Sequence, residues 1–149
     1  MALWVMSTLV VLINATCSHP SEVAPDGLLR VTLKPGESHQ VNASDTIYTI
    51  TYNTTKIKFA EGLGEGNILY VYMLGDVKLA INQDSVQITA EGHYDSKGGR
   101  QSSSWTHLKD TQGTADIGSL TIGVANFYPV VDDPFLSEGF AIDLLIQQK

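Results

Sequence analysis

The residues with the clearest chemical potential lie around Trp105. Its neighbours Ser104, Thr106 and His107 offer hydrogen-bonding groups, and Arg100 lies shortly before it. An indole in such surroundings can stack on a sugar ring or anchor a protein partner, since Trp and Arg are frequent interface anchors. The alternative is that the indole packs on a sheet and holds a long loop in place. We take Trp105, Arg100 and His107 as candidate ligand-binding residues.

A second group of aromatic residues comes from a stretch punctuated by prolines. Tyr128 precedes Pro129, and Phe135 follows Pro134. Exposed together, the two rings would form an apolar surface that needs a partner, whereas folded back they would close one end of the fold. Tyr128 and Phe135 complete the set of candidate ligand-binding residues.

Catalytic motifs are missing from the sequence. It contains neither a Gly-x-Ser-x-Gly elbow nor a His-Glu-x-x-His pair. Ser104, His107 and Asp110 could form a nucleophile set, but they share one polar segment, and catalysis needs such groups on rigid elements. The glutamates that could serve as a glycosidase pair, Glu61, Glu65 and Glu91, are not placed by any pattern at the required separation. We predict that the chain is not an enzyme.

Metal and cofactor signals are equally weak. Asp132, Asp133 and Glu138 form the best oxygen cluster for calcium, yet a solvated turn before Pro134 accounts for them. The glycine-rich stretch 61–66 lacks the Lys-Ser/Thr that follows the glycines of a phosphate-binding loop. We therefore expect neither a metal nor a cofactor, and we interpret 61–66 as a flexible connection.

The N-terminus indicates the compartment. Residues 1–18 resemble a secretory signal peptide, with a short apolar run followed by small residues, and the run is too short to span a bilayer. Cleavage there would remove Cys17, the single cysteine, and leave a disulfide-free domain. We predict a secreted, extracellular protein, with a loose leader at 19–27 and one domain at 28–149. Asn42 and Asn53 each begin an N-glycosylation acceptor tripeptide.

The charge narrows the class of partner. The formal net charge is −7 over 149 residues. Nucleic acids and anionic membrane surfaces need clustered Lys and Arg, so this balance argues against both. With no second apolar segment long enough to span a bilayer, we expect no membrane span. An extracellular glycan or protein partner remains, and the oligomeric state stays open.

Residues 67–90 predict three consecutive strands. Two apolar runs in this stretch are separated by Gly75 and Asp76. Glycine first in a two-residue loop supplies the positive φ of a type II′ turn, which predicts a hairpin at this point. The register that follows from such a hairpin places Tyr72 and Leu74 on the buried face.

The remaining apolar stretches complete an all-β prediction. Alternation and turn signals place further strands at 28–34, 37–41, 45–52, 56–59, 85–91, 117–127 and 139–146. The polar stretch 95–116 reads as a long loop, with a possible short strand at 105–109. Seven to nine short strands favour an antiparallel β-sandwich or jelly roll. The length, the leader and the stretch 139–143 look like those of CUB-like extracellular β-sandwiches, although the cysteines that usually pin such modules are missing.

These observations favour a secreted binding module that recognises a glycan or protein through the loops 95–116 and 127–138. The alternative is a structural or matrix component that assembles through sheet edges. A CUB-like secreted defence protein and an extracellular hydrolase have less support.

Overall fold

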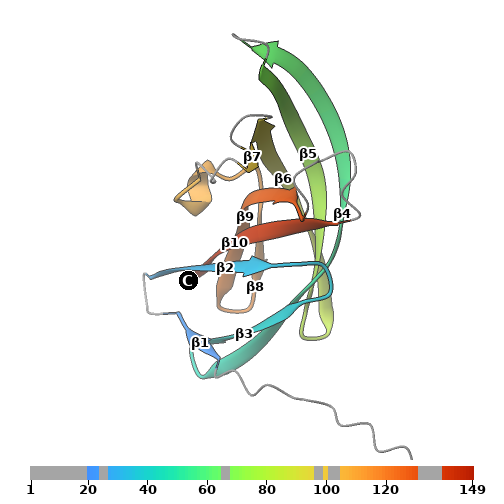
Figure 1. Cartoon of the computed structure of the whole chain (residues 1–149). Helices are drawn as coiled ribbons and strands as arrows, with labels where there is room; N and C mark the ends of the chain where they lie inside the picture. Colours follow the sequence, from blue (N-terminus) through green and yellow to red (C-terminus); the bar gives the residue numbers. More distant parts are fainter. Residues whose placement is uncertain (1–19, 24–26, 65–67, 96–98, 101–104, 131–138) are drawn as a thin grey trace, which may run out of the picture.

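The computed structural model describes residues 20–23, 27–64, 68–95, 99–100, 105–130 and 139–149 (Figure 1). The predicted signal peptide and Phe135 lie outside these ranges. Within them, no helix is long and apolar enough to cross a membrane. The single cysteine of the sequence excludes a disulfide within the chain, as predicted.

The described chain is almost entirely β-structure, which confirms the predicted class. One 3-10 helix, η2, covers Leu108–Asp110. The strands are β1 Ser21–Glu22, β2 Leu28–Leu33, β3 Ser38–Ala43, β4 Thr46–Gly64, β5 Ile68–Ile81, β6 Asp84–Asp95, β7 Gly99–Arg100, β8 Thr114–Ile117, β9 Leu120–Pro129 and β10 Phe140–Gln148.

The strands form two sheets that share one apolar core. The larger sheet has the order β1-β3-β4-β5-β6-β7 and the smaller one β2-β10-β9-β8. Figure 1 shows β2 and β10 running across the long strands of the larger sheet. Both sheets contribute fully buried side chains to the core, among them Ile50 and Leu79 from the larger sheet and Ile122 and Leu144 from the smaller.

Most neighbouring strands in each sheet are consecutive in the chain. Strands β3 to β7 follow one another in the larger sheet, as β8 to β10 do in the smaller. A jelly roll is built from two Greek keys instead. The predicted two-sheet arrangement is therefore present as a pair of meanders, with β2 added beside β10.

The hairpin predicted at Gly75 and Asp76 is wrong. Both residues lie inside β5, where Gly75 pairs with Ile57 of β4 and with Ala90 of β6. A Cβ at Gly75 would lie 2.9 Å from Cζ of Phe127, so the glycine makes room for a ring from the smaller sheet. The glycine serves close packing between sheets, and the chain stays extended through it.

Loss of the hairpin reverses the predicted faces in the first half of β5. Val71 and Met73 are buried, whereas Tyr72 is 47% exposed and Leu74 44% exposed. In an uninterrupted strand the side chains alternate without a break, so the inward set continues from Met73 through Gly75 to the rest of β5. Tyr72 and Leu74 therefore lie on the outer face of the larger sheet.

Strand β4 merges what the sequence predicts as two strands and a flexible link. A bulge between Tyr52 and Thr54 shifts the register, so that the buried face passes from Tyr52 to Ile57. Residues 61–64, expected to be part of a flexible connection, continue the strand to its end. Near the end of β4, the ring of Phe59 packs against that of Phe140 at a centroid distance of 6.3 Å and is still 42% exposed.

Three further predictions need correction. The leader expected to be loose at 19–27 contains β1, which pairs in parallel with β3, and Val23 is buried in the core. The short strand considered at 105–109 is absent, since η2 occupies part of that stretch. The loop predicted at 95–116 also contains β7 and most of β8.

Replacing Gly75 by alanine tests the inter-sheet contact. The added methyl group would lie 2.7 Å from Cγ2 of Thr55 and 2.9 Å from Phe127. We expect Gly75→Ala to lower the free energy of unfolding by about 1–3 kcal/mol through overpacking, measured by urea denaturation. Gly62→Ala is the matched control, because nothing lies within 4 Å of a Cβ there. Equal stability of the two variants would contradict the contact.

Candidate binding sites

Residues 105–113 cover part of the outer face of the smaller sheet. Leu108, the first residue of η2, is buried against Ala125 of β9 and Leu145 of β10. Trp105 packs against the same cluster and is partly buried. The segment thus has its own small apolar core on the side of the sheet that faces away from the main core.

A glycine in β9 allows this segment to lie close to the sheet. A Cβ at Gly123 would lie 2.8 Å from Cδ2 of Leu108 and 2.9 Å from Oγ1 of Thr111. The Thr111 hydroxyl donates to the carbonyl of Leu108 at 2.7 Å, which closes the turn after η2. Close packing and this local bond fix the shape of the segment.

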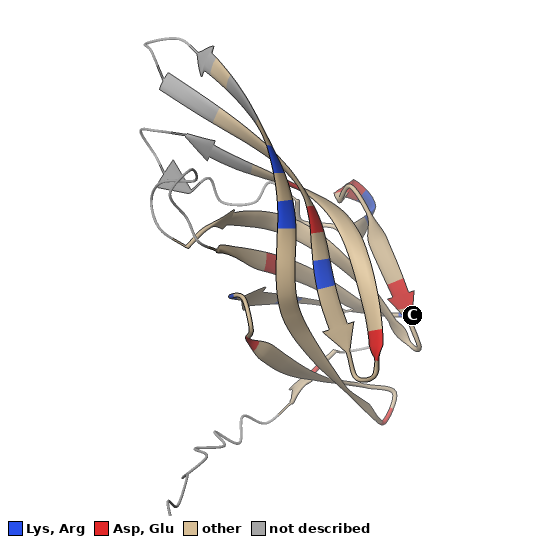
Figure 2. Ribbon diagram, turned by 90° about the vertical axis from the view of Figure 1, so that its right-hand side faces the viewer, with Lys and Arg blue, Asp and Glu red and all other residues tan. Residues whose placement is uncertain are grey.

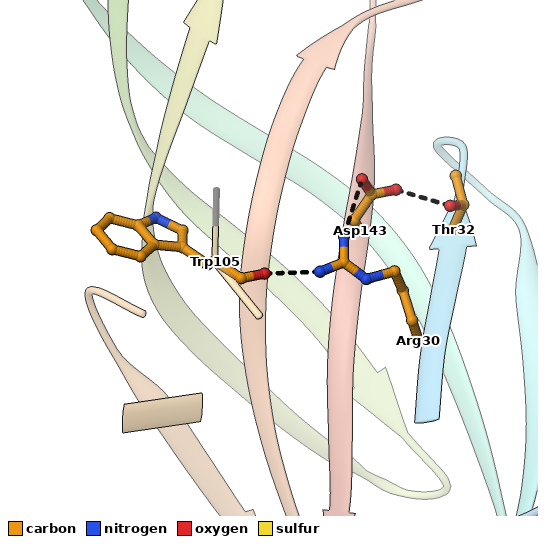
Figure 3. A network of polar contacts seen from close by, with 4 residues as sticks. All are labelled: Arg30, Thr32, Trp105 and Asp143. Carbon is orange, nitrogen blue, oxygen red and sulfur yellow. Dashed lines mark hydrogen bonds and ion pairs between the residues drawn. The ribbon is translucent and has the colours of Figure 1, made fainter. Parts of the chain in front are cut away.

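Arg30 ties the start of the segment to the sheet (Figure 3). Its guanidinium donates to the carbonyl oxygen of Trp105 at 2.6 Å and lies 3.9 Å from a carboxylate oxygen of Asp143. Asp143 is 2% exposed, and its other carboxylate oxygen accepts from the hydroxyl of Thr32 at 2.7 Å. A buried carboxylate on β10 thus holds a cation on β2, and that cation holds the segment.

The structure places the five predicted ligand-binding residues in different surroundings. Trp105 supplies its carbonyl to Arg30 and its ring to the small cluster, which agrees with the packing alternative. Tyr128 is 8% exposed, so its side chain is largely covered. Arg100 belongs to β7, but its side chain, like all of Phe135, lies outside what the structure describes. Of the five, His107 is exposed at the surface.

A shallow cleft of about 460 Å³ opens beside His107. Its lining residues are Leu28, His107, Leu108, Lys109 and Gln147. The volume lies within the range of small-ligand sites, which is roughly 300–1,000 Å³. The cleft lies between the 105–113 segment and the adjoining ends of β2 and β10, so rigid strands support two of its sides.

The charge of the cleft differs from that of the protein as a whole. Among the lining residues that the structure describes, Lys109 is a cation, His107 is an imidazole and none is a carboxylate. The protein as a whole carries a net charge of −7. The cleft is therefore suited to a ligand that combines an anionic group with hydrogen-bonding groups for Gln147 and His107.

Of the residues that line this cleft, sequence reasoning selected His107 as a ligand-binding candidate and did not select the others. Leu28, Lys109 and Gln147 look like ordinary residues of strand ends and loops. Their approach depends on pairing between β2 and β10, near opposite ends of the chain. No local pattern carries that information.

The outer face of the larger sheet is a second exposed surface. Tyr72 and Leu74 stand at consecutive outward positions of β5, with Lys58 beside Leu74 on β4. A groove of about 210 Å³ passes between β4 and β5 at Lys58, Leu74 and Asp76. Figure 2 shows the charged positions of these two strands close together on one side of the molecule.

The described residues contain no group of three or more His, Cys, Asp or Glu side chains placed to hold a metal ion. Comparison with known proteins gives no match to a family model, to a curated protein sequence or to a solved structure. The cleft beside His107 and the outer face of the larger sheet are therefore the observations on which a function can be based.

Removal of the Arg30 guanidinium should loosen the 105–113 segment. Arg30→Ala leaves the Asp143 carboxylate without its cation and the Trp105 carbonyl without this donor. We expect a loss of about 1–2 kcal/mol in stability, limited because the guanidinium is partly exposed to solvent. Amide hydrogen exchange within 105–113 should accelerate, while exchange in β5 stays unchanged. Lys34→Ala, which removes an exposed cation just after the same strand, is the control, and the idea fails if both variants exchange alike.

Of the two predicted glycosylation sites, Asn53 is the better placed. It lies at the β4 bulge and is exposed, whereas Asn42 is only partly exposed and its Oδ1 atom is buried. When the parent chain is secreted from eukaryotic cells, we expect it to be heavier than the bare polypeptide, and a peptide glycosidase should remove the extra mass. Asn53→Gln should remove the same extra mass. Asn42→Gln should leave that extra mass in place. Extra mass that depends on Asn42 alone would show the opposite preference.

Proposed function

We propose that this chain is a secreted, non-catalytic binding module that recognises an acidic extracellular glycan at the cleft beside His107. The observation that carries the proposal is the cleft itself, whose described lining holds His107 and Lys109 without a carboxylate on a strongly acidic protein.

Preorganisation supports a binding role. Arg30, Leu108 and Thr111 hold the segment that carries both basic residues, so the cleft does not need to form when the ligand arrives. A surface shaped in advance loses less conformational entropy on binding. Sites held by rigid elements are also more precise than sites on free loops.

The composition of the cleft favours a glycan over a protein ligand. Protein interfaces are centred on large buried aromatic or aliphatic anchors. Leu28 is the one exposed large apolar residue among those that line the cleft, at 43% exposure. Lys109 can pair with a carboxylate or sulfate, while Gln147 and His107 can bond hydroxyl groups. The shallow shape fits one or two sugar rings better than a folded surface.

The sheet edges give less support to the alternative of a structural component that assembles through them. The outermost strands of the larger sheet, β1 and β7, have two residues each in the described chain. Short edge strands offer few unpaired backbone groups for another chain. Assembly by edge pairing would have to use the part of β6 before Tyr94, where β7 begins to pair, or the six-residue edge strand β2 of the smaller sheet.

The direct test is binding to defined oligosaccharides that carry carboxylate or sulfate groups, each beside its neutral counterpart. We expect selective binding of acidic probes, reduced about tenfold by Lys109→Ala and less strongly by His107→Ala, since a charge-assisted contact is worth roughly 1.5–3 kcal/mol. Lys34→Ala makes the same change of charge away from the cleft and should stay within about twofold of the parent chain.

Two results would contradict the proposal. One is equal binding of acidic and neutral probes, or no binding of either. The other is an equal effect of Lys109→Ala and Lys34→Ala, because the net charge alone would then explain the loss.

A further inference from the structure

The outer face of the larger sheet carries an ordered pattern of charge across three strands. Leu74 on β5 has Lys58 as its partner on β4 and Glu91 as its partner on β6. In the next row, Asp76 lies between Lys56 on β4 and Thr89 on β6. The β4 side of this surface carries two lysines, its centre carries Leu74 beside Asp76, and its β6 side carries Glu91 beside the uncharged Thr89. We call these six outward residues, together with Tyr72, the β5 face.

We propose that the β5 face binds a second copy of this chain, through a two-fold axis that runs parallel to β5. Such an axis turns one face onto the other and lays β4 of each copy over β6 of the other. The side with the two lysines then meets the side with Glu91 twice, and the two Leu74 side chains meet at the centre. The pattern on one face is thus complementary to itself.

The rows of the face define the expected contacts. Lys58 of each copy lies over Glu91 of the other, because both residues belong to the row of Leu74. Asp76 comes to lie between its own Lys56 and the second copy's Lys56, so the two Asp76 carboxylates near the axis are compensated. Sheets that pack face to face keep their strands within about 30° of each other, which leaves these pairs within reach.

Apolar exposure at the centre supplies the attraction. Leu74 is 44% exposed and Tyr72 47% exposed, both on a strand that lies in the interior of its sheet. Covering large apolar side chains at adjacent outward positions removes apolar surface from water, which stabilises the contact. The charges on either side then select the orientation more than they add affinity.

The area of the face sets the strength of the contact. Three strands at about 4.8 Å and three rows at about 6.7 Å cover roughly 300 Å² per copy, less than half that of a standard interface. We therefore expect a weak dimer, with a dissociation constant on the order of 10–100 μM. The dimer does not depend on the proposed glycan site, which lies on the smaller sheet.

Sedimentation equilibrium across about 5 μM to 1 mM protein tests the proposal. We expect reversible dimerisation of the parent chain, and a loss of at least about fivefold in association for both Lys58→Glu and Glu91→Lys. These two substitutions change the net charge in opposite directions. Weakening by both would exclude a simple effect of overall repulsion between acidic chains.

The decisive result is whether a double variant with both charges reversed regains dimerisation. In the double variant Lys58→Glu with Glu91→Lys, each pair is reversed but still opposite in sign, so association should return to within about threefold of the parent. An equimolar mixture of the two single variants should also form a mixed dimer, because both of its pairs join opposite charges. Circular dichroism confirms that each variant is folded.

Leu74→Asp should abolish the dimer. Its matched control is Ile47→Asp, since Ile47 is 53% exposed on the outer side of β4 but lies away from the β5 face. A parent chain that stays monomeric at 1 mM overturns the proposal. So does a dimer that either single variant leaves unchanged, or one that the double variant fails to restore. A monomer that instead binds a different protein through Leu74 would also overturn it.

Discussion

The contact of Phe127 with two strands of the larger sheet is the constraint on which much of this structure depends. Phe127 of β9 is fully buried, and its ring occupies the space that a side chain at Gly75 would fill. Its carbonyl oxygen lies so close to Gly92 of β6 that a Cβ there could not be accommodated without a backbone shift. Phe127 also meets the ring of Phe140 edge-on at 6.2 Å. The smaller sheet therefore fits against the larger one where neighbouring strands carry no side chain.

This packing explains why the sequence predicts the strands well and their faces less well. Alternation of apolar residues identified the stretches that form the longer strands, including the pattern of Leu120, Ile122 and Val124 in β9, but not β1, β7 and β8. A glycine between two apolar runs has two physical uses, a positive φ in a turn or a close approach within a sheet. Local sequence cannot separate them, because the ring that needs the space lies more than 50 residues further along. Choosing the turn inverted the predicted faces of Tyr72 and Leu74, and so hid the outer surface of the larger sheet.

The candidate cleft shows a similar limit. Trp105 and His107 could be singled out from residue type alone. The contacts that position them could not, since Arg30 is separated from Trp105 by 75 positions and Thr32 from Asp143 by 111. Asp143 is also misleading in the sequence, where a single carboxylate in an apolar strand looks like a solvated position. In the fold it faces away from the main core, yet it is buried because the 105–113 segment and Arg30 cover that side of β10.

The two surfaces lie on different sheets, and this separation has a consequence for binding. A contact between copies through the β5 face would leave the outer faces of both smaller sheets exposed, each with its own cleft beside His107. A pair of shallow, weak sites held by one rigid body can engage two residues of the same glycan, or two neighbouring glycans, with an effective concentration that each site alone lacks. For sites this open, individual affinity is limited because few groups are desolvated on binding. Under the proposed function, self-association would give the module avidity and would couple the two surfaces through mass action without any change of shape.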